Sequence, residues 1–302
     1  MVEETGKILG NGFGTYTRNV NIAVPFILNL LATGIFTIVM FVAGVAAIFG
    51  SSLSDIESVA TPEEILMVLV PMISQNITEI VLLGIIFILV YMLIQSFFTA
   101  GAIGMARQAT ETGTSDLSTM INDGKKNAVN LYLANILAGL FMLAGIVFLV
   151  PGALKGGISL SSPDTGAVLL LVIGILLWAA YMLVLSIVLA LYSYALVVEN
   201  LGPIDGIIKG VDFFRTHKFD VLLLWIIQIA AVIILSITGE VMALVPVIGT
   251  VWSFIGMFIS VAVIAPLTTI WWVRLYMSGT GKKLYFNELL LHPNDLGKLE
   301  TD

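Results

Sequence analysis

Six long apolar runs restrict what this chain can fold into. They cover residues 22–49, 80–105, 128–150, 168–198, 221–238 and 247–277. A helix needs roughly 20 apolar residues to cross the hydrocarbon core of a bilayer, and each run meets or nearly meets that length. The sequence therefore predicts an all-α integral membrane bundle of six transmembrane helices, forming a single domain over the whole chain.

The composition excludes the soluble classes of protein. Of the 302 residues, 59% are hydrophobic and only 11% are charged, whereas soluble domains carry about 25% charged residues. The mean hydropathy is +1.06. The chain has no cysteine, which excludes disulfides, thiolate metal sites and cysteine nucleophiles. The net charge of −7 is carried mostly on one predicted side, and the more basic side is nearly balanced, so no nucleic-acid partner is expected.

The distribution of basic residues orients the predicted bundle. When the six runs cross the membrane alternately, all but one of the 13 Lys and Arg residues fall on the same side, and Lys155 is the exception. Lys and Arg collect on the cytoplasmic side of membrane proteins. The count therefore predicts a multi-pass protein of the cell membrane with both termini in the cytoplasm.

Three similar segments precede the odd-numbered runs. The third segment, before the fifth run, begins at Pro203, which suits the first position of a helix. The second segment, before the third run, follows a candidate cap at Ser115. The first is interrupted by several glycines. The third segment carries apolar residues at helical spacing, with charged residues on the other face: Ile204, Ile207, Ile208, Val211 and Phe214, opposite Asp205, Lys209, Asp212 and Arg215.

This similarity predicts three parallel repeats, each a cytoplasmic amphipathic helix followed by a transmembrane hairpin. The units cover about 1–106, 107–198 and 199–277, and a cytoplasmic tail follows at 278–302. An amphipathic helix at the interface buries its apolar face among acyl chains while its basic residues meet anionic headgroups. The residues predicted to contact the membrane surface are Lys125, Lys126, Lys209, Arg215 and Lys218.

One stretch of the third unit resembles a known group of membrane proteins. It runs from Glu199-Asn200-Leu201-Gly202-Pro203 through Phe213-Phe214-Arg215-Thr216-His217-Lys218. The shared pattern is a Gly-Pro turn, an amphipathic helix, a basic anchor and an apolar span, and residues 98–124 of the second unit are similar. The group is prokaryotic, and it includes the membrane domain attached to some glycerophosphodiester phosphodiesterases. The soluble catalytic domain of those enzymes is absent, so the resemblance implies an architecture and no activity.

Polar residues inside the bilayer cost free energy unless they find partners, so they are candidates for binding. Gln95, Asn135 and Gln228 lie within the second, third and fifth runs. They either face a common polar cavity that binds a solute or headgroup, or hydrogen-bond between helices. Glu240 lies near the predicted outer boundary, where it either carries a proton or captures a cation, or is solvated among the headgroups.

The sequence shows no catalytic constellation. His217 and His292 are far apart in sequence, and no metal site or cofactor is expected. We therefore predict a non-enzymatic accessory or lipid-organising protein whose partners are membrane lipids and, as a further candidate, another membrane protein. The alternative is a transporter or lipid-translocating protein that uses a cavity between the three hairpins.

Overall fold

A computed structural model describes residues 3–50, 70–71, 73–156 and 165–285 of the chain, so the predicted tail is described only as far as residue 285. Every regular element in the described ranges is a helix. In chain order these are α1 (Thr5–Arg18), η1 (Val20–Ala23), α2 (Val24–Phe49), α5 (Ile77–Thr112), α6 (Leu117–Ala144), η3 (Gly145–Leu149), α7 (Val150–Gly156), α8 (Thr165–Val188), α9 (Tyr192–Glu199), α10 (Pro203–Thr216), α11 (Lys218–Ala243), α12 (Pro246–Ile259), η4 (Ser260–Ile264) and α13 (Ala265–Gly279).

The six predicted spans are confirmed as helical stretches long and apolar enough to cross a membrane. Most extend beyond the apolar runs by several residues, because polar residues at their ends continue the helix. The third combines α6, η3 and α7, the fourth combines α8 and α9, and the sixth combines α12, η4 and α13. The six stretches are Val20–Ile48, Ile77–Thr112, Leu117–Lys155, Thr165–Glu199, Lys218–Ala243 and Val247–Gly279.

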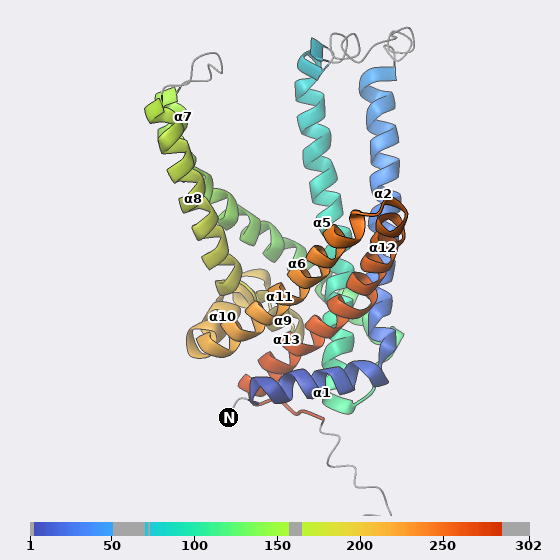
Figure 1. Cartoon of the computed structure of the whole chain (residues 1–302). Coiled ribbons are helices and arrows are strands. Elements are labelled where there is room, and N and C mark those ends of the chain that lie inside the picture. Colours follow the sequence, from blue (N-terminus) through green and yellow to red (C-terminus); the bar gives the residue numbers. More distant parts are fainter. Residues whose placement is uncertain (1–2, 51–69, 72, 157–164, 286–302) are drawn as a thin grey trace, which may run out of the picture.

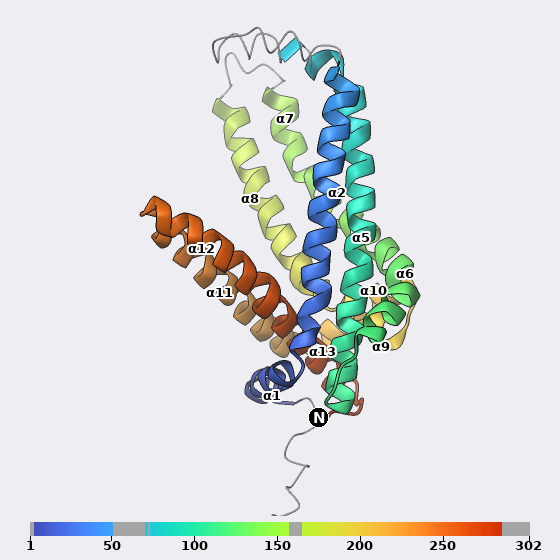
Figure 2. The ribbon, with the colours of Figure 1, turned by 90° about the vertical axis from the view of Figure 1, so that its right-hand side faces the viewer.

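Consecutive spans pack side by side as three pairs. Helix α2 packs along α5, α7 along α8, and α11 along α12. The three pairs start from a common layer and diverge from it (Figure 1). The view turned by 90° shows α11 and α12 tilting away from α2 and α5 (Figure 2). We call the common layer the base; it consists of α1, α9, α10 and α13 with residues 96–112 of α5 and 117–138 of α6.

Burial is concentrated in the base. The far halves of the helix pairs instead expose large apolar side chains, such as Phe41, Leu176 and Phe254. An exposed apolar surface of this extent is stable only in contact with hydrocarbon. The largest fully buried apolar side chains all lie in the base or beside it: Ile8, Ile22, Ile103, Met105, Leu131, Leu191, Leu196, Leu224, Ile270, Leu275 and Tyr276.

Each even-numbered span ends at a residue with a left-handed backbone. Gly113 (φ 83°) follows α5, Asn200 (φ 54°) follows α9, and Gly281 (φ 69°) lies just beyond α13. No other residue in the described ranges has a positive φ. Gly and Asn adopt this conformation most readily, and it terminates a helix.

A glycine in each of the three similar segments packs closely against an even-numbered span. A Cβ on Gly12 would clash with the indole of Trp271 on α13. A Cβ on Gly124 would come within 2.9 Å of the Phe97 ring on α5, and one on Gly210 within 2.6 Å of the Tyr192 backbone nitrogen on α9. Only glycine therefore allows these close contacts between helices.

Two ion pairs, one buried and one part-buried, tie the base together. Arg274 Nε lies 2.7 Å from a carboxylate oxygen of Glu3, and both side chains are almost fully buried. Arg107 Nη2 lies 3.1 Å from Asp123 Oδ2, and its other terminal nitrogen donates to the carbonyls of Val197 and Val198. Arg107 therefore joins α5, α6 and α9.

Pro266 lies inside the sixth apolar run, and a proline within a helix predicts a break. The sixth span is interrupted at this point. Pro266 lies at the start of α13, and residues Ser260–Ile264 immediately before it form a π-helix. Proline has no N–H to offer the carbonyl four residues earlier, which is that of Ala262. The hydroxyl of Tyr16, on α1, donates a hydrogen bond to this oxygen. Burial raises the pKa of Tyr16, so the hydroxyl keeps its proton at neutral pH.

The segment before the third span is not a separate helix. Residues predicted to lie along the surface form the first turns of α6, which continues without a break to Ala144. The N-cap is Asp116 rather than Ser115, because the Asp116 carboxylate accepts from the backbone N–H of Ser118. No proline or left-handed residue interrupts this stretch, whereas α10 ends at Thr216 and α11 begins at Lys218.

Candidate functional site

The amide of Asn135 joins three helices. Its Nδ2 donates to Ser96 Oγ on α5 at 2.9 Å, and its Oδ1 accepts from the Tyr192 hydroxyl on α9 at 2.6 Å. Both ends of the amide therefore have partners. Hydrogen bonds of this kind between membrane helices contribute about 0.6 kcal/mol each on average.

The side-chain amides of Gln228 and Gln95 lie on two other helices and take no part in the hydrogen bonds of Asn135. Gln228 on α11 accepts a hydrogen bond from the indole nitrogen of Trp272 on α13 at 2.6 Å. Gln95 lies on an exposed face of α5. Asn135 thus connects α5, α6 and α9, whereas Gln228 connects α11 and α13, and the structure does not assemble the three amides around one site.

Glu240 lines a groove between α11 and α12 of about 410 Å³. The groove also contains the indole of Trp252 and the hydroxyl groups of Ser236 and Ser253. Glu240 itself is exposed, and it lies at the far end of the helix pair from the base. It therefore shares no surface with Asn135 or Gln228.

The five basic residues predicted to contact a membrane surface are all exposed. Four of them lie on the base, and Lys218, the first residue of α11, lies beside it. Lys209 Nζ is 4.0 Å from Glu199, and Arg215 is 3.7 Å from Asp212. Exposed apolar side chains stand beside them on α10 and α11, namely Ile204, Ile208 and Phe219. Leu117 and Ile121 are similarly exposed on α6, near Lys125 and Lys126.

A polar cavity of about 240 Å³ lies where α2 and α5 meet the π-helix of span six. One side-chain atom in it, Oδ1 of Asn29, is buried without a hydrogen-bond partner among the described residues. π-Helices occur frequently at functional sites. We call this the Asn29 cavity, and its lining residues are Phe26, Asn29, Leu30, Thr33, Tyr91, Ser260, Val261 and Ala265.

Sequence reasoning missed Asn29, although the signal was present. Asn29 stands inside the first apolar run, so the criterion that selected Gln95, Asn135 and Gln228 applies to it equally. The contributions of Tyr91 and Ser260 required the fold, because these residues lie on two other spans.

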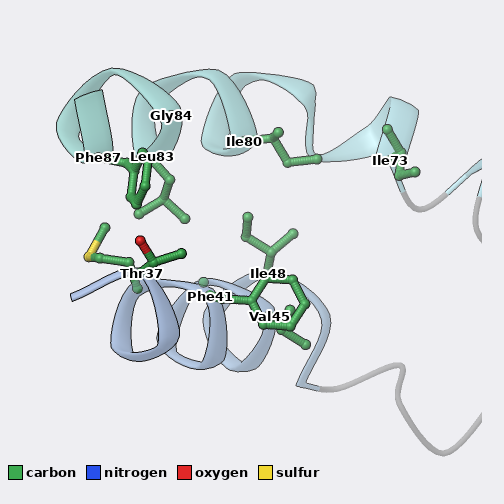
Figure 3. A pocket seen from close by; sticks show the side chains of 11 residues that line it. Thr37, Phe41, Val45, Ile48, Ile73, Ile80, Leu83, Gly84 and Phe87 are labelled. Carbon is green, nitrogen blue, oxygen red and sulfur yellow. The ribbon is translucent and has the colours of Figure 1, made fainter. Parts of the chain in front are cut away.

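An apolar groove of about 500 Å³ runs between the far halves of α2 and α5. Side chains from the two helices face each other across it, among them Phe41 and Ile48 from α2, and Ile80 and Leu83 from α5 (Figure 3). Gly44 and Gly84 widen it, because neither carries a side chain. We call this the α2–α5 groove. Among the described residues that line it, only Thr37 carries a hydroxyl, and this hydroxyl donates to the carbonyl of Thr33.

Metal ligands do not gather in the part of the chain that the structure describes. No three His, Asp or Glu side chains in these ranges lie close enough to hold an ion. The candidate sites are the polar Asn29 cavity and the apolar α2–α5 groove, the Glu240 groove, and the basic surface of the base.

Comparison with known proteins places the chain among relatives without a described activity. A family model described as "Domain of unknown function (DUF7847)" matches residues 65–276. An uncharacterized protein of Archaeoglobus fulgidus is 25% identical over 287 residues, which cover 91% of this chain and 96% of the relative. No solved structure matches the chain.

Proposed function

The chain belongs to the DUF7847 family of unknown function, and from its geometry we propose that it is a non-enzymatic, lipid-organising membrane protein. One observation carries the proposal: the three helix pairs share a packed base and diverge from it, leaving apolar faces exposed. Lipid chains between the pairs would complete the packing that the protein itself leaves open.

Basic side chains on the base and beside it support the second part of the proposal, which is contact with anionic lipid headgroups. Lys209, Arg215 and Lys218 are exposed beside Ile208 and Phe219. Apolar side chains next to cations suit the interface of a membrane with anionic headgroups, where each cation contributes about 1 kcal/mol. The acidic neighbours of Lys209 and Arg215 weaken their share, so we expect the three together to give about a tenfold preference for anionic lipid.

We also propose that the base is cytoplasmic and is built from three repeats. Two observations support the repeats. Each even-numbered span ends at a left-handed residue, and each is contacted by a glycine of one similar segment. Gly12 contacts α13, Gly124 contacts α5, and Gly210 contacts α9. An ion pair accompanies each contact. The first segment contacts the last span, so the three units would close into a ring.

The resemblance to the membrane domain of some glycerophosphodiester phosphodiesterases agrees with a lipid role. It includes Gly202-Pro203, which begin α10 in the structure. In this proposal the chain organises lipid and carries out no reaction itself, and a protein partner would act beside it.

A spin-label experiment tests the proposal. The full chain is reconstituted in vesicles, and the fraction of motionally restricted lipid is measured with labelled phosphatidylglycerol and with labelled phosphatidylcholine. The wild type should prefer the anionic probe. The triple variant Lys209→Gln, Arg215→Gln, Lys218→Gln should lose that preference, and the charge-keeping variant Lys209→Arg, Arg215→Lys, Lys218→Arg should retain it. An unchanged preference in the Gln variant would sink the proposal.

Lipid translocation is the second candidate, and the Asn29 cavity favours it. A π-helix and a proline give span six a break, and the break lines a polar cavity within an apolar bundle. A translocating protein would need a hydrated path between the helix pairs, and cysteine labelling can detect such a path.

A further inference from the structure

The Asn29 cavity and the α2–α5 groove lie end to end on the same helix pair. On α2 the cavity is lined by Asn29 and Thr33, and the groove continues with Thr37 and Phe41. These residues are four apart, so they share one face of the helix. On α5, Tyr91 of the cavity and Phe87 of the groove are also four apart, and their rings stack at 5.9 Å. Polar and apolar spaces thus form one elongated site.

The polar end suits a small uncharged head. The buried Oδ1 of Asn29 has no partner among the described residues, and a buried acceptor left unpaired costs about 1–3 kcal/mol. Tyr91 and Ser260 add hydroxyl groups to the lining, and none of the described residues that line it is charged. A hydroxyl of a ligand can donate to Asn29 and accept in return. A phosphate or carboxylate would enter this space without a countercharge, at a large cost.

The apolar end suits one long chain. On α2 the groove runs from Thr37 to Ile48, or about 17 Å at the usual rise. One leaflet of a bilayer is about 15 Å thick in its hydrocarbon region, so the groove matches the length of one extended acyl chain. The hydroxyl of Thr37 in the wall is already bonded to the helix backbone.

We propose that this site binds one lipid with a small, uncharged, hydroxylated head at Asn29 and a single long chain in the α2–α5 groove. The inference rests on the proposed function as a lipid-contacting protein and names a specific lipid class within it. It differs from contact at the base, because it requires neither Lys209 nor any other charge.

Photo-crosslinking with a defined probe tests the site. The full chain is reconstituted in phosphatidylcholine vesicles with a 1-oleoylglycerol analogue that carries a diazirine in its chain, and labelled peptides are mapped by mass spectrometry. Labels should concentrate on α2 and α5. Unlabelled 1-oleoylglycerol should compete about tenfold better than methyl oleate, which has the same chain but no hydroxyl, or 1-oleoyl lysophosphatidate, whose head is charged.

Two variants separate the head from the chain. Asn29→Leu should abolish the tenfold advantage of 1-oleoylglycerol over methyl oleate and leave the labelled positions unchanged. Gly84→Leu should fill the groove and reduce labelling at least fivefold. A Cβ at Gly84 meets no atom within 4 Å, so the substitution is compatible with the fold. Gly139→Leu is the matched control, since it adds the same side chain in open space on α6.

The outcomes are distinct from those of the spin-label experiment. Labels spread evenly over the three helix pairs, equal competition by all three lipids, or a full hydroxyl preference in Asn29→Leu would each overturn the proposal. None of these results alters the anionic preference expected at the base. Conversely, loss of that preference leaves the crosslinking result unaffected.

Discussion

The hydroxyl of Tyr16 donates a hydrogen bond to the backbone oxygen of Ala262, the carbonyl that Pro266 has no N–H to satisfy. The two residues are separated by 246 positions in the sequence. The contact joins α1 to the π-helix of span six, and so connects the start of the described chain to its last span. Pro266 therefore interrupts span six and also leaves the Ala262 carbonyl available as the acceptor that joins α1 to this span.

Tyr16→Phe should destabilise the protein by about 1 kcal/mol, because it removes the donor while keeping the ring. In a Pro266→Ala background the same change should cost less, since residue 266 then supplies its own N–H. Thermal unfolding of the four proteins in detergent gives this double-mutant cycle. Equal losses in both backgrounds would show that the hydroxyl does not act through the proline break.

The same contact predicts a pH dependence. The pKa of Tyr16 is raised by burial, so the protonated form is favoured in the folded state. The resulting stability is present below the ordinary tyrosine pKa of about 10 and declines as the pH rises above it. The difference in unfolding temperature between wild type and Tyr16→Phe should therefore be constant from pH 6 to 9 and shrink above pH 10.

Glu3→Leu should cost about 3 kcal/mol, because it removes the carboxylate that lies 2.7 Å from the buried Arg274 guanidinium and replaces it with an apolar side chain. Asn11, which donates to the same carboxylate at 2.6 Å, would lose its acceptor as well. The double variant Glu3→Leu, Arg274→Leu should recover most of the loss. Denaturant unfolding in detergent measures both, and a double variant no more stable than Glu3→Leu would contradict this account.

Gly210→Ala should destabilise the protein by about 2 kcal/mol, because its Cβ would lie 2.6 Å from the backbone nitrogen of Tyr192. Gly14→Ala is the matched control on α1, where a Cβ meets nothing within 4 Å. In that position alanine should stabilise the helix by about 0.5–1 kcal/mol. Opposite shifts in unfolding temperature are expected, and shifts of the same sign would exclude close packing at Gly210 as the cause.

Cysteine labelling separates lipid organisation from translocation. The chain has no cysteine, so single replacements at Gln95, Asn135 and Gln228 can be probed without background by a membrane-impermeant maleimide. Because Asn135 and Gln228 are bonded between helices, we expect neither to react. Leu244→Cys serves as the reactive control, since this side chain is 81% exposed in the turn between α11 and α12. Reaction at Asn135 or Gln228 would favour the translocation function.

The sequence predicted the spans well and the base only in part. Apolar runs of sufficient length determine a membrane helix almost alone, and Pro266 and Pro203 marked a helix break and a helix start. The contacts of Arg107 with α9 could not be foreseen, because nothing in the local pattern indicates which helices meet. The site was foreseen less well: Gln95, Asn135 and Gln228 stand out as polar residues, but whether each one pairs or binds depends on neighbours such as Tyr192 and Trp272.

The uneven burial described above has a mechanical consequence. Side chains interlock at one end of the molecule, so that end resists deformation, while the opposite ends of the helix pairs diverge and expose apolar side chains. The spread of the three pairs is then set by the lateral pressure and thickness of the bilayer. Such a molecule would respond to a change in the bilayer by changing the angles between its three helix pairs, while the base keeps its shape.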